Sequence, residues 1–309
     1  MKKQETTMKR LCVSAGIVML AAASALAVRE DAAKGAAAPR QWGNTIGKDV
    51  FTSASVIVRD ANEPGLKPGI QESHIKAGEG DLRFYVFAPK NYNPGKAYPV
   101  VFTFNGTLVG ENSWMTTLAP VLEKYGYLCV NPNGQSREGV DALYAWIQKH
   151  AKIDKSRVYA MGSSRGGLFA IDLVLTTSYF AAVAPVAAML REGRLKVDSP
   201  KIPVFQINGD QDQTVPYNGG KSHGASLLGA LESVRIWAKH NGCGAEPVVD
   251  KSVKGFVLYK YPGGPGAPEA IQCTVLNTGH SVLRILPEQE TTQLTEMVWQ
   301  FFGRHAKNP

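Results

Sequence analysis

The sequence predicts an α/β domain built on a single doubly wound, mostly parallel sheet flanked by helices. Two observations favour this class. Short apolar runs typical of buried strands alternate along the chain with segments of helical periodicity. Residues 159–170 also read as an apolar strand, a tight turn with serine at its apex and then a helix. The 309 residues contain no internal repeat, no long linker and no sign of a second folded domain.

Nine segments have the composition of strands. The strongest is 98–104, a nearly continuous apolar run of the kind that is buried on both faces of a central strand. The segment 128–130 is short and ends at Pro132, and 158–161 leads into the serine turn. The other strand segments are 50–58, 82–88, 180–186, 204–207, 257–261 and 273–276.

Four further segments have apolar residues at helical spacing, in addition to the helix after the serine turn. In 226–240, for example, Leu227, Leu231 and Val234 recur on one face. The other three segments are 115–125, 140–150 and 288–305. Strands and helices therefore alternate through most of the chain, as a doubly wound sheet requires.

The first 27 residues have the three parts of a secretory signal peptide. Four basic residues precede a short apolar run over 11–23, and a final Ala-Leu-Ala fits the small-x-small cleavage rule. The run is short for a membrane span and lacks a stop-transfer flank, which favours a cleaved signal over an uncleaved anchor. We therefore expect a secreted or periplasmic protein, with a flexible lead-in over 28–48 and the folded domain over 49–309.

Composition and charge narrow the classes of partner. The net charge is +8, and loss of residues 1–27 removes four basic residues and one acidic residue, leaving about +5. No basic run is interleaved with aromatic residues, which argues against a nucleic-acid partner. The chain has neither a C-x-x-C nor an H-E-x-x-H motif, so no metal site is predicted.

Three cysteines follow the predicted signal peptide. In an oxidising compartment two of them are expected to form a disulfide. Cys243, in a turn, and Cys273, at the edge of a strand, are the better pair. Cys129 lies inside an apolar run, which favours a buried free thiol.

The turn at the centre of the pattern is a G-x-S-x-G match, from Gly162 to Gly166, with Ser164 at its middle. This motif places a serine hydroxyl on a strained strand-to-helix turn. The turn is so tight that a Cβ two residues to either side of the serine would collide with neighbouring backbone. The motif alone is common, and the strand before it and the helix after it make it informative.

A serine nucleophile needs a base, and the base needs an orienting acid. The loop that follows strand 204–207 offers two carboxylates, Asp210 and Asp212. The base is expected after the last strand, where His280 stands next to a glycine. The other histidines precede the serine, lie in or near helices, or lie close to the C-terminus.

Backbone N–H groups are expected to form an oxyanion hole. One belongs to the residue after the nucleophile, Arg165, and the second to the loop after the early central strand, where Thr107 is the candidate. Trp114 is a candidate for the wall of the cleft. No cofactor is needed for this chemistry.

From about residue 80 onward the chain resembles the α/β-hydrolase superfamily, and more closely the secreted polyhydroxybutyrate depolymerase-like and feruloyl-esterase-like serine esterases. The resemblance implies an α/β-hydrolase fold, with Ser164 as nucleophile, Asp212 as acid and His280 as base. It also implies a small-molecule or polymeric ester substrate. The matching segments, in the order of the family, are 154–167 around Gly162-Ser163-Ser164-Arg165-Gly166, 180–187, 212–217, 237–243 and Gly279-His280-Ser281.

Three positions depart from the family pattern. Asn105-Gly106 stands where the family usually has His-Gly, and Arg165 stands where the family often has a small residue. Val282-Leu283 replaces a common Trp-Pro whose aromatic ring often belongs to the substrate wall. We therefore expect a serine esterase whose candidate substrates are polyhydroxyalkanoate and aromatic, feruloyl-type esters, and the sequence does not decide between them. The alternatives are a serine peptidase of the same fold and a catalytically inactive binding module.

Overall fold

The computed structural model describes residues 56–307, apart from 108–112, 223 and 265–266. The predicted signal peptide (1–27), the lead-in (28–48) and the start of the predicted domain lie outside the described residues. Within the described residues, no helix is both long enough and apolar enough to cross a membrane.

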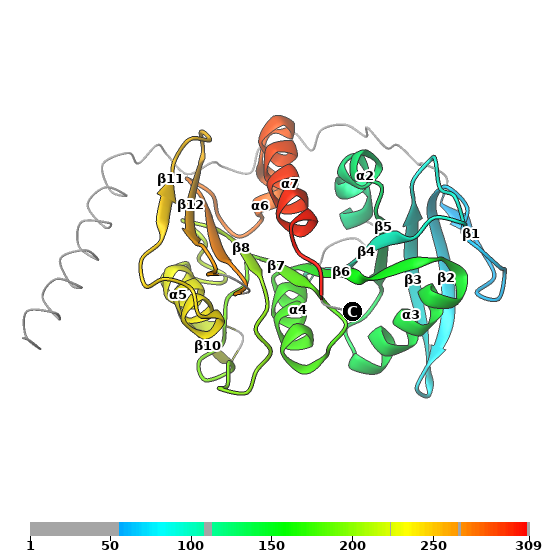
Figure 1. Ribbon diagram of the computed structural model, residues 1–309, viewed down its shortest axis with the longest axis horizontal. Coiled ribbons are helices and arrows are strands. Elements are labelled where there is room, and N and C mark those ends of the chain that lie inside the picture. The colour runs from blue at the N-terminus through cyan, green and yellow to red at the C-terminus, as the bar shows by residue number, and fades with distance from the viewer. Residues whose placement is uncertain (1–55, 108–112, 223, 265–266, 308–309) are drawn as a thin grey trace, which may run out of the picture. The chain divides into compact units, whose positions relative to one another are not determined.

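In the described part of the chain, eleven strands form one mixed sheet (Figure 1). The strands are β1 (Ile57–Val58), β2 (Gly69–Ala77), β3 (Gly80–Ala88), β4 (Tyr98–Phe104), β5 (Leu128–Pro132), β6 (Ile153–Ser163), β7 (Ala182–Val186), β8 (Val204–Gly209), β11 (Val248–Asp250), β12 (Phe256–Tyr261) and β13 (Ala270–Val275). Their order is β1-β2-β3-β5-β4-β6-β7-β8-β13-β12-β11. All neighbours from β5 to β13 in this order are parallel. The predicted class, a mostly parallel sheet, is therefore confirmed.

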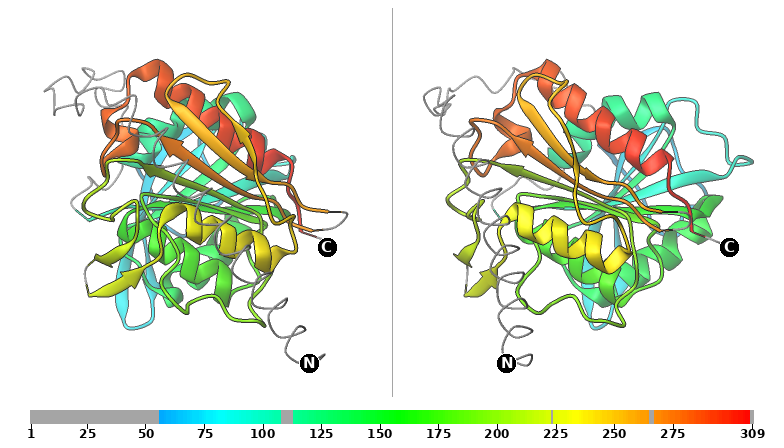
Figure 2. Two further views of the ribbon diagram at one scale, coloured as in Figure 1. Left: turned by 90° about the vertical axis from the view of Figure 1, so that its left-hand side faces the viewer. Right: turned by 60° about the vertical axis from the view of Figure 1, so that its left-hand side comes forward.

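Helices cover both faces of the sheet (Figure 2). One face carries α3 (Arg137–His150), α4 (Arg165–Thr176) and α5 (Ala230–Asn241), and the other carries α2 (Ser113–Tyr125), α6 (Val282–Ile285) and α7 (Glu288–Gly303). Strand β4 illustrates why both faces are apolar. Val100 and Phe102 pack into the cluster beneath α3, α4 and α5, while Val101 packs into the cluster beneath α2 and α7.

Strand β2 was not predicted, because two of its three buried residues are polar. Gln71 and Ser73 are fully buried, and each finds a hydrogen-bond partner outside the strand. Gln71 Nε2 donates to Lys67 O, and Ser73 Oγ donates to Arg59 O. Apolar periodicity therefore missed a strand whose buried side chains are satisfied polar groups.

The predicted helix over 226–240 begins later than expected. Residues 225–227 form β10 (Ala225–Leu227), which pairs in an antiparallel hairpin with β9 (Gly220–Ser222). Helix α5 begins only at Ala230 and ends at Asn241, and the capping residue Gly242 adopts the left-handed conformation with φ 84°. Leu227, which we had placed on the helix, is instead a strand residue.

The predicted Cys243–Cys273 disulfide is wrong, since both residues are free thiols. Cys273 is buried in the cluster beneath α2 and α7, whereas Cys243 packs against the cluster on the other face of the sheet. Cys243 Sγ donates to Pro268 O at 3.2 Å. The prediction of Cys129 as a buried free thiol is confirmed, and burial raises the pKa of this thiol to about 12.

Candidate active site

Ser164 lies at the junction between β6 and α4, in a backbone conformation that is rare for a residue with a side chain. Its φ is 54° and its ψ is −120°. The surrounding sheet holds this conformation in place, because Ser164 N donates to Val186 O of the neighbouring strand at 2.8 Å. The turn therefore presents the serine hydroxyl at the carboxyl ends of the parallel strands.

The two outer glycines of the motif are required by close backbone contacts. A Cβ on Gly162 would lie 2.3 Å from Gly166 O, and a Cβ on Gly166 would lie 2.1 Å from Phe104 O. Both distances are far below van der Waals contact, and both partners are backbone atoms that cannot swing away. The predicted reason for the glycines is thus confirmed, with β4 as the neighbouring element at Gly166.

Asp212 is buried and uses its two carboxylate oxygens differently. Oδ2 lies 2.7 Å from Nδ1 of His280. Oδ1 accepts backbone hydrogen bonds from Thr214 N at 2.8 Å and Val215 N at 2.9 Å. One oxygen therefore holds the carboxylate in its own loop, and the other orients the imidazole.

Asp210, the other carboxylate of this loop, does not contact the imidazole. Its Oδ1 accepts a hydrogen bond from Thr278 N at 3.2 Å, and Gln211 N donates to Thr278 O at 3.0 Å. Asp210 therefore ties the loop after β8 to the loop after β13. The two candidate acids thus have separate positions, and Asp212 is the one beside His280.

His280 connects the carboxylate to the serine. Its Nε2 lies 2.9 Å from Ser164 Oγ, and its side chain keeps 24% of its surface exposed. A carboxylate only accepts hydrogen bonds, so the contact with Asp212 places the proton on Nδ1. Nε2 then carries the lone pair and can accept the proton of the serine hydroxyl.

A small crevice opens beside Ser164, with a volume of about 90 Å³. The loop after β4 forms one wall. Hydrogen bonds from Gln135, beyond β5, and from Asn131, within β5, hold this loop and the end of β4 in place. Gln135 Nε2 donates to Asn105 O at 2.6 Å, and Asn131 Nδ2 donates to Thr103 O at 3.0 Å. Gly106, Thr107, Trp114, Thr117, Ser163, Ser164, His280 and residues 281–284 line the crevice.

Thr107 and Trp114, two of the predicted site residues, therefore face the same space as Ser164. The supporting Asn131 and Gln135 were not predicted. Asn131 is fully buried at the end of an apolar strand. A buried amide at the carboxyl end of a parallel strand is the signal that could have identified it.

Arg165 is the first residue of α4, and its side chain is exposed. Its guanidinium makes no hydrogen bond or ion pair with another residue that the structure describes. Its backbone belongs to the first turn of the helix, where N–H groups are free of intrahelical partners and carry partial positive charge.

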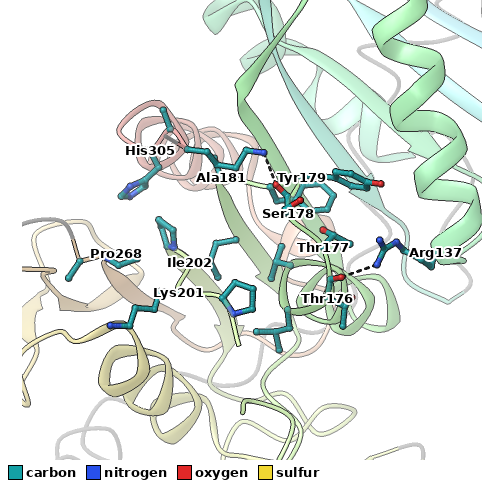
Figure 3. Close-up of a pocket in the computed structure, with 18 residues that line it drawn as sticks. Arg137, Thr176, Thr177, Ser178, Tyr179, Ala181, Lys201, Ile202, Pro268 and His305 are labelled. Atoms are coloured by element: carbon teal, nitrogen blue, oxygen red, sulfur yellow. Dashed lines mark hydrogen bonds between the residues drawn. The ribbon is translucent and has the colours of Figure 1, made fainter. Parts of the chain in front are cut away.

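A larger cavity, with a volume of about 940 Å³, lies at the opposite edge of the sheet, where the parallel strands begin (Figure 3). It is lined by Ala181, Ile202 and Pro268, which precede β7, β8 and β13, and its cations include Arg137 and Lys201. None of Ser164, Asp212 and His280 lines it. The larger of the two cavities is therefore separate from the serine and its partners.

Comparison with known proteins finds esterases among the sequences that are similar to this chain. No family model matches. The chain is 32% identical over 146 residues to feruloyl esterase B of Piromyces equi, covering 44% of this chain and 27% of that protein. It is 26% identical over 151 residues to a bifunctional acetylxylan esterase/xylanase of Neocallimastix patriciarum, covering 43% of this chain and 22% of that protein. The chain thus spans about a quarter of the length of these relatives.

Solved structures share the fold at low sequence identity. Thermogutta terrifontis esterase 2 superposes with a TM-score of 0.52 and 15% identity, covering 79% of this chain and 98% of that structure. The acylaminoacyl peptidase of Pyrococcus horikoshii gives a TM-score of 0.52 at 12% identity, covering 78% of this chain and 43% of that structure. The closer resemblance to polyhydroxybutyrate depolymerase-like proteins stays a prediction. The chain has the α/β-hydrolase fold, and parts of its sequence are similar to parts of known esterases.

Proposed function

We propose that the protein is a serine esterase that hydrolyses carboxylic esters through an acyl-enzyme. The observation that carries the proposal is the hydrogen-bonded series from Asp212 through His280 to Ser164, at 2.7 and 2.9 Å, beside an open crevice. A serine hydroxyl is a weak nucleophile unless a base is in reach, and here the base is within hydrogen-bond distance. The esterase relatives support the same class of reaction.

In the first step His280 Nε2 takes the hydroxyl proton as Ser164 Oγ attacks the carbonyl carbon of the ester. The imidazole becomes positively charged, and the carboxylate of Asp212 stabilises that charge through Nδ1. Because Asp212 is held by two backbone N–H groups, it keeps the ring oriented without moving itself.

The negative charge that develops on the carbonyl oxygen needs hydrogen-bond donors that are already in place. We assign this role to the backbone N–H of Arg165, at the N-terminus of α4, and to that of Thr107 in the loop after β4. The positive end of the α4 dipole adds to the stabilisation. The hydrogen bond from Gln135 to Asn105 O holds this loop two residues before Thr107, the proposed donor.

The tetrahedral intermediate then collapses as His280 returns its proton to the leaving alcohol. Water enters, and His280 takes a proton from it as the water oxygen attacks the carbonyl carbon of the acyl-enzyme. The second tetrahedral intermediate collapses as His280 returns this proton to Ser164 Oγ, which releases the carboxylic acid and restores the free hydroxyl. Proton transfer at Ser164, His280 and water accounts for every step of the cycle.

Replacement of Ser164 by alanine tests the proposal. Turnover of p-nitrophenyl acetate is expected to fall by a factor of about 10³ or more, because the nucleophile is lost while the fold remains. Circular dichroism checks the fold, and Ser178→Ala removes an exposed hydroxyl at the opposite edge of the sheet as the matched control. Equal turnover by the Ser164→Ala variant and the wild type would refute the assignment.

The peptidase alternative shares the same nucleophile. It rests on the same three residues, because a serine, histidine and aspartate can also hydrolyse amides. Comparing p-nitrophenyl acetate with p-nitroacetanilide separates the two, since an esterase is expected to leave the anilide intact. Labelling of Ser164 by a fluorophosphonate separates both enzymes from an inactive binding module.

We also propose that the protein is exported. The basic residues, apolar run and Ala-Leu-Ala of residues 1–27 support this proposal. N-terminal sequencing of the exported form is expected to begin at Val28. Retention of residues 1–27 in the exported form would contradict cleavage at this site.

A further inference from the structure

Arg165 is conspicuous because it directly follows Ser164 and its guanidinium has no partner among the described residues. Elsewhere in the described chain, arginines commonly lie beside a carboxylate. Such ion pairs join Arg83 to Glu72, Arg137 to Asp141, Arg157 to Asp154, Arg191 and Arg194 to Asp172, and Arg304 to Glu269.

The position of Arg165 next to the nucleophile puts the reacting atoms within reach of its guanidinium. Consecutive Cα atoms are about 3.8 Å apart, and an arginine side chain is longer than that spacing. Because the side chain is exposed and bound to no described residue, it is free to turn toward a substrate held at Ser164. An unpaired arginine on a surface is ordinary in itself, so its neighbours decide the interpretation.

The described residues around Ser164 add a second cation, and the carboxylates among them are engaged. Arg284 of α6 lines the crevice and is exposed. None of the described residues that line the crevice is acidic. The two nearby carboxylates are already engaged, Asp212 by His280 and Asp210 by the N–H of Thr278.

We propose that the site selects esters that carry a carboxylate close to the scissile bond, with the Arg165 guanidinium as the receptor for that carboxylate. This proposal rests on the proposed esterase function. A guanidinium binds a carboxylate through two parallel N–H···O hydrogen bonds, which gives direction as well as charge. Arg284 contributes a second positive charge to the same opening.

The experiment compares esters that differ only in a carboxylate or its neutral carboxamide. For a carboxylate on the acyl side, the pair is 4-nitrophenyl hydrogen glutarate and 4-nitrophenyl glutaramate. For a carboxylate on the alcohol side, the pair is 4-acetoxybenzoate and 4-acetoxybenzamide. The readout is the ratio of kcat/KM for the carboxylate ester over that for the amide, corrected for the rate without enzyme.

We expect wild-type protein to prefer the carboxylate in at least one pair, which also tells which side of the ester bears it. Arg165→Gln is expected to lower this ratio about tenfold, and Arg165→Lys by less, because lysine keeps the charge without the planar fork. Raising the salt concentration is expected to lower the wild-type ratio as well.

Lys201→Gln is the matched control, since it also removes one positive charge but lies in the cavity at the opposite edge of the sheet (Figure 3). It is expected to leave the ratio unchanged. Three outcomes overturn the proposal while leaving the esterase intact: no carboxylate preference in either pair, no fall in the ratio for Arg165→Gln, or an equal fall in the ratio for Lys201→Gln. Absence of Ser164-dependent turnover of every ester overturns the proposed function itself.

Discussion

Strand β13 has a carboxylate–imidazole pair at each of its ends. Before the strand, Glu269 Oε1 lies 2.8 Å from Nε2 of His305. After the strand, His280 Nδ1 lies 2.7 Å from Oδ2 of Asp212. The two contacts are nearly equal in length, so the pair alone does not distinguish a candidate catalytic histidine from a structural one.

The surroundings of each pair make the difference. Glu269 also accepts a hydrogen bond from Arg304 at 2.8 Å, and the His305 ring packs on Phe301 with centroids 4.8 Å apart. That cluster fixes the end of α7 to the start of β13. Asp212 is held by backbone N–H groups instead of a cation, and the second nitrogen of His280 faces a serine hydroxyl. The Glu269–His305 pair has no such nucleophile beside its imidazole among the described residues.

The largest expected effect separates the two pairs by activity. Asp212→Asn keeps the shape of the side chain but loses the charge that orients and stabilises His280, and kcat for p-nitrophenyl acetate is expected to fall about 10³-fold or more. Glu269→Gln makes the same kind of change at the other pair and is expected to alter kcat less than about threefold. Similar losses in both variants would contradict the distinction.

The second prediction concerns the turn between β6 and α4, which holds Ser164 beside His280. In Gly166→Ala, the new Cβ would lie 2.1 Å from Phe104 O, so the turn and the end of β4 have to separate. We expect a loss of about 2 kcal/mol in the free energy of unfolding. We also expect kcat/KM to fall about 100-fold, because a small displacement of the reacting groups is costly.

Gly303→Ala is the matched control for this change. It lies at the end of α7, beside the structural pair, and its Cβ would have no atom within 4 Å. Its free energy of unfolding is expected to change by less than about 0.5 kcal/mol. A Gly166→Ala variant with full activity would contradict the close contact with β4.

The third prediction concerns the contribution of the Glu269–His305 pair to the stability of the folded protein. Burial alone raises the pKa of Glu269, but hydrogen bonds from His305 and Arg304 outweigh burial and leave this pKa below its usual value of 4.5. The ionised form is thus favoured by folding. Its contribution is fully present above the pKa of the unfolded chain and is lost as pH falls through the lower folded value.

Glu269→Gln is therefore expected to reduce the free energy of unfolding by about 1 kcal/mol at pH 7, with a smaller difference from wild type below about pH 4. Urea denaturation at both pH values measures this. Glu246→Gln, at an exposed carboxylate, is expected to change little at either pH. A difference between Glu269→Gln and wild type that stays constant with pH would contradict the role of the ionised pair.

The strands and helices that could be predicted from the sequence are those whose buried side chains are apolar. Strand β4 was predicted with its observed bounds because both of its faces are packed and nearly every residue is apolar. Strand β2 was missed because Gln71 and Ser73 occupy two of its three buried positions. Hydrophobic pattern cannot reveal a polar side chain that is buried with its hydrogen bond satisfied.

The candidate site was predictable to a different degree at each residue. Ser164 and His280 follow from the motif and from the order of strands. Asp210 and Asp212 could not be separated from their loop alone, because which of them meets His280 depends on how the loop after β8 docks on the loop after β13. The disulfide failed for a similar reason, since the sequence does not tell which face of the sheet a cysteine occupies.

The smallest expected effect concerns Cys243 and Cys273, the two cysteines of the predicted disulfide. Cys273 lies within β13, between the two carboxylate–imidazole pairs. Loss of a native disulfide typically costs about 2–5 kcal/mol, whereas Cys243→Ser is expected to change the free energy of unfolding by less than about 0.5 kcal/mol without reductant. Serine can keep the hydrogen bond to Pro268 O.

Alkylation of the thiols tests the same separation. Burial raises the pKa of Cys129 and Cys273, so iodoacetamide at pH 8 is expected to leave these two thiols unmodified in the folded protein. After unfolding it is expected to alkylate Cys129, Cys243 and Cys273. A Cys243–Cys273 cross-linked peptide in a non-reducing digest would contradict the separation of these thiols by the sheet.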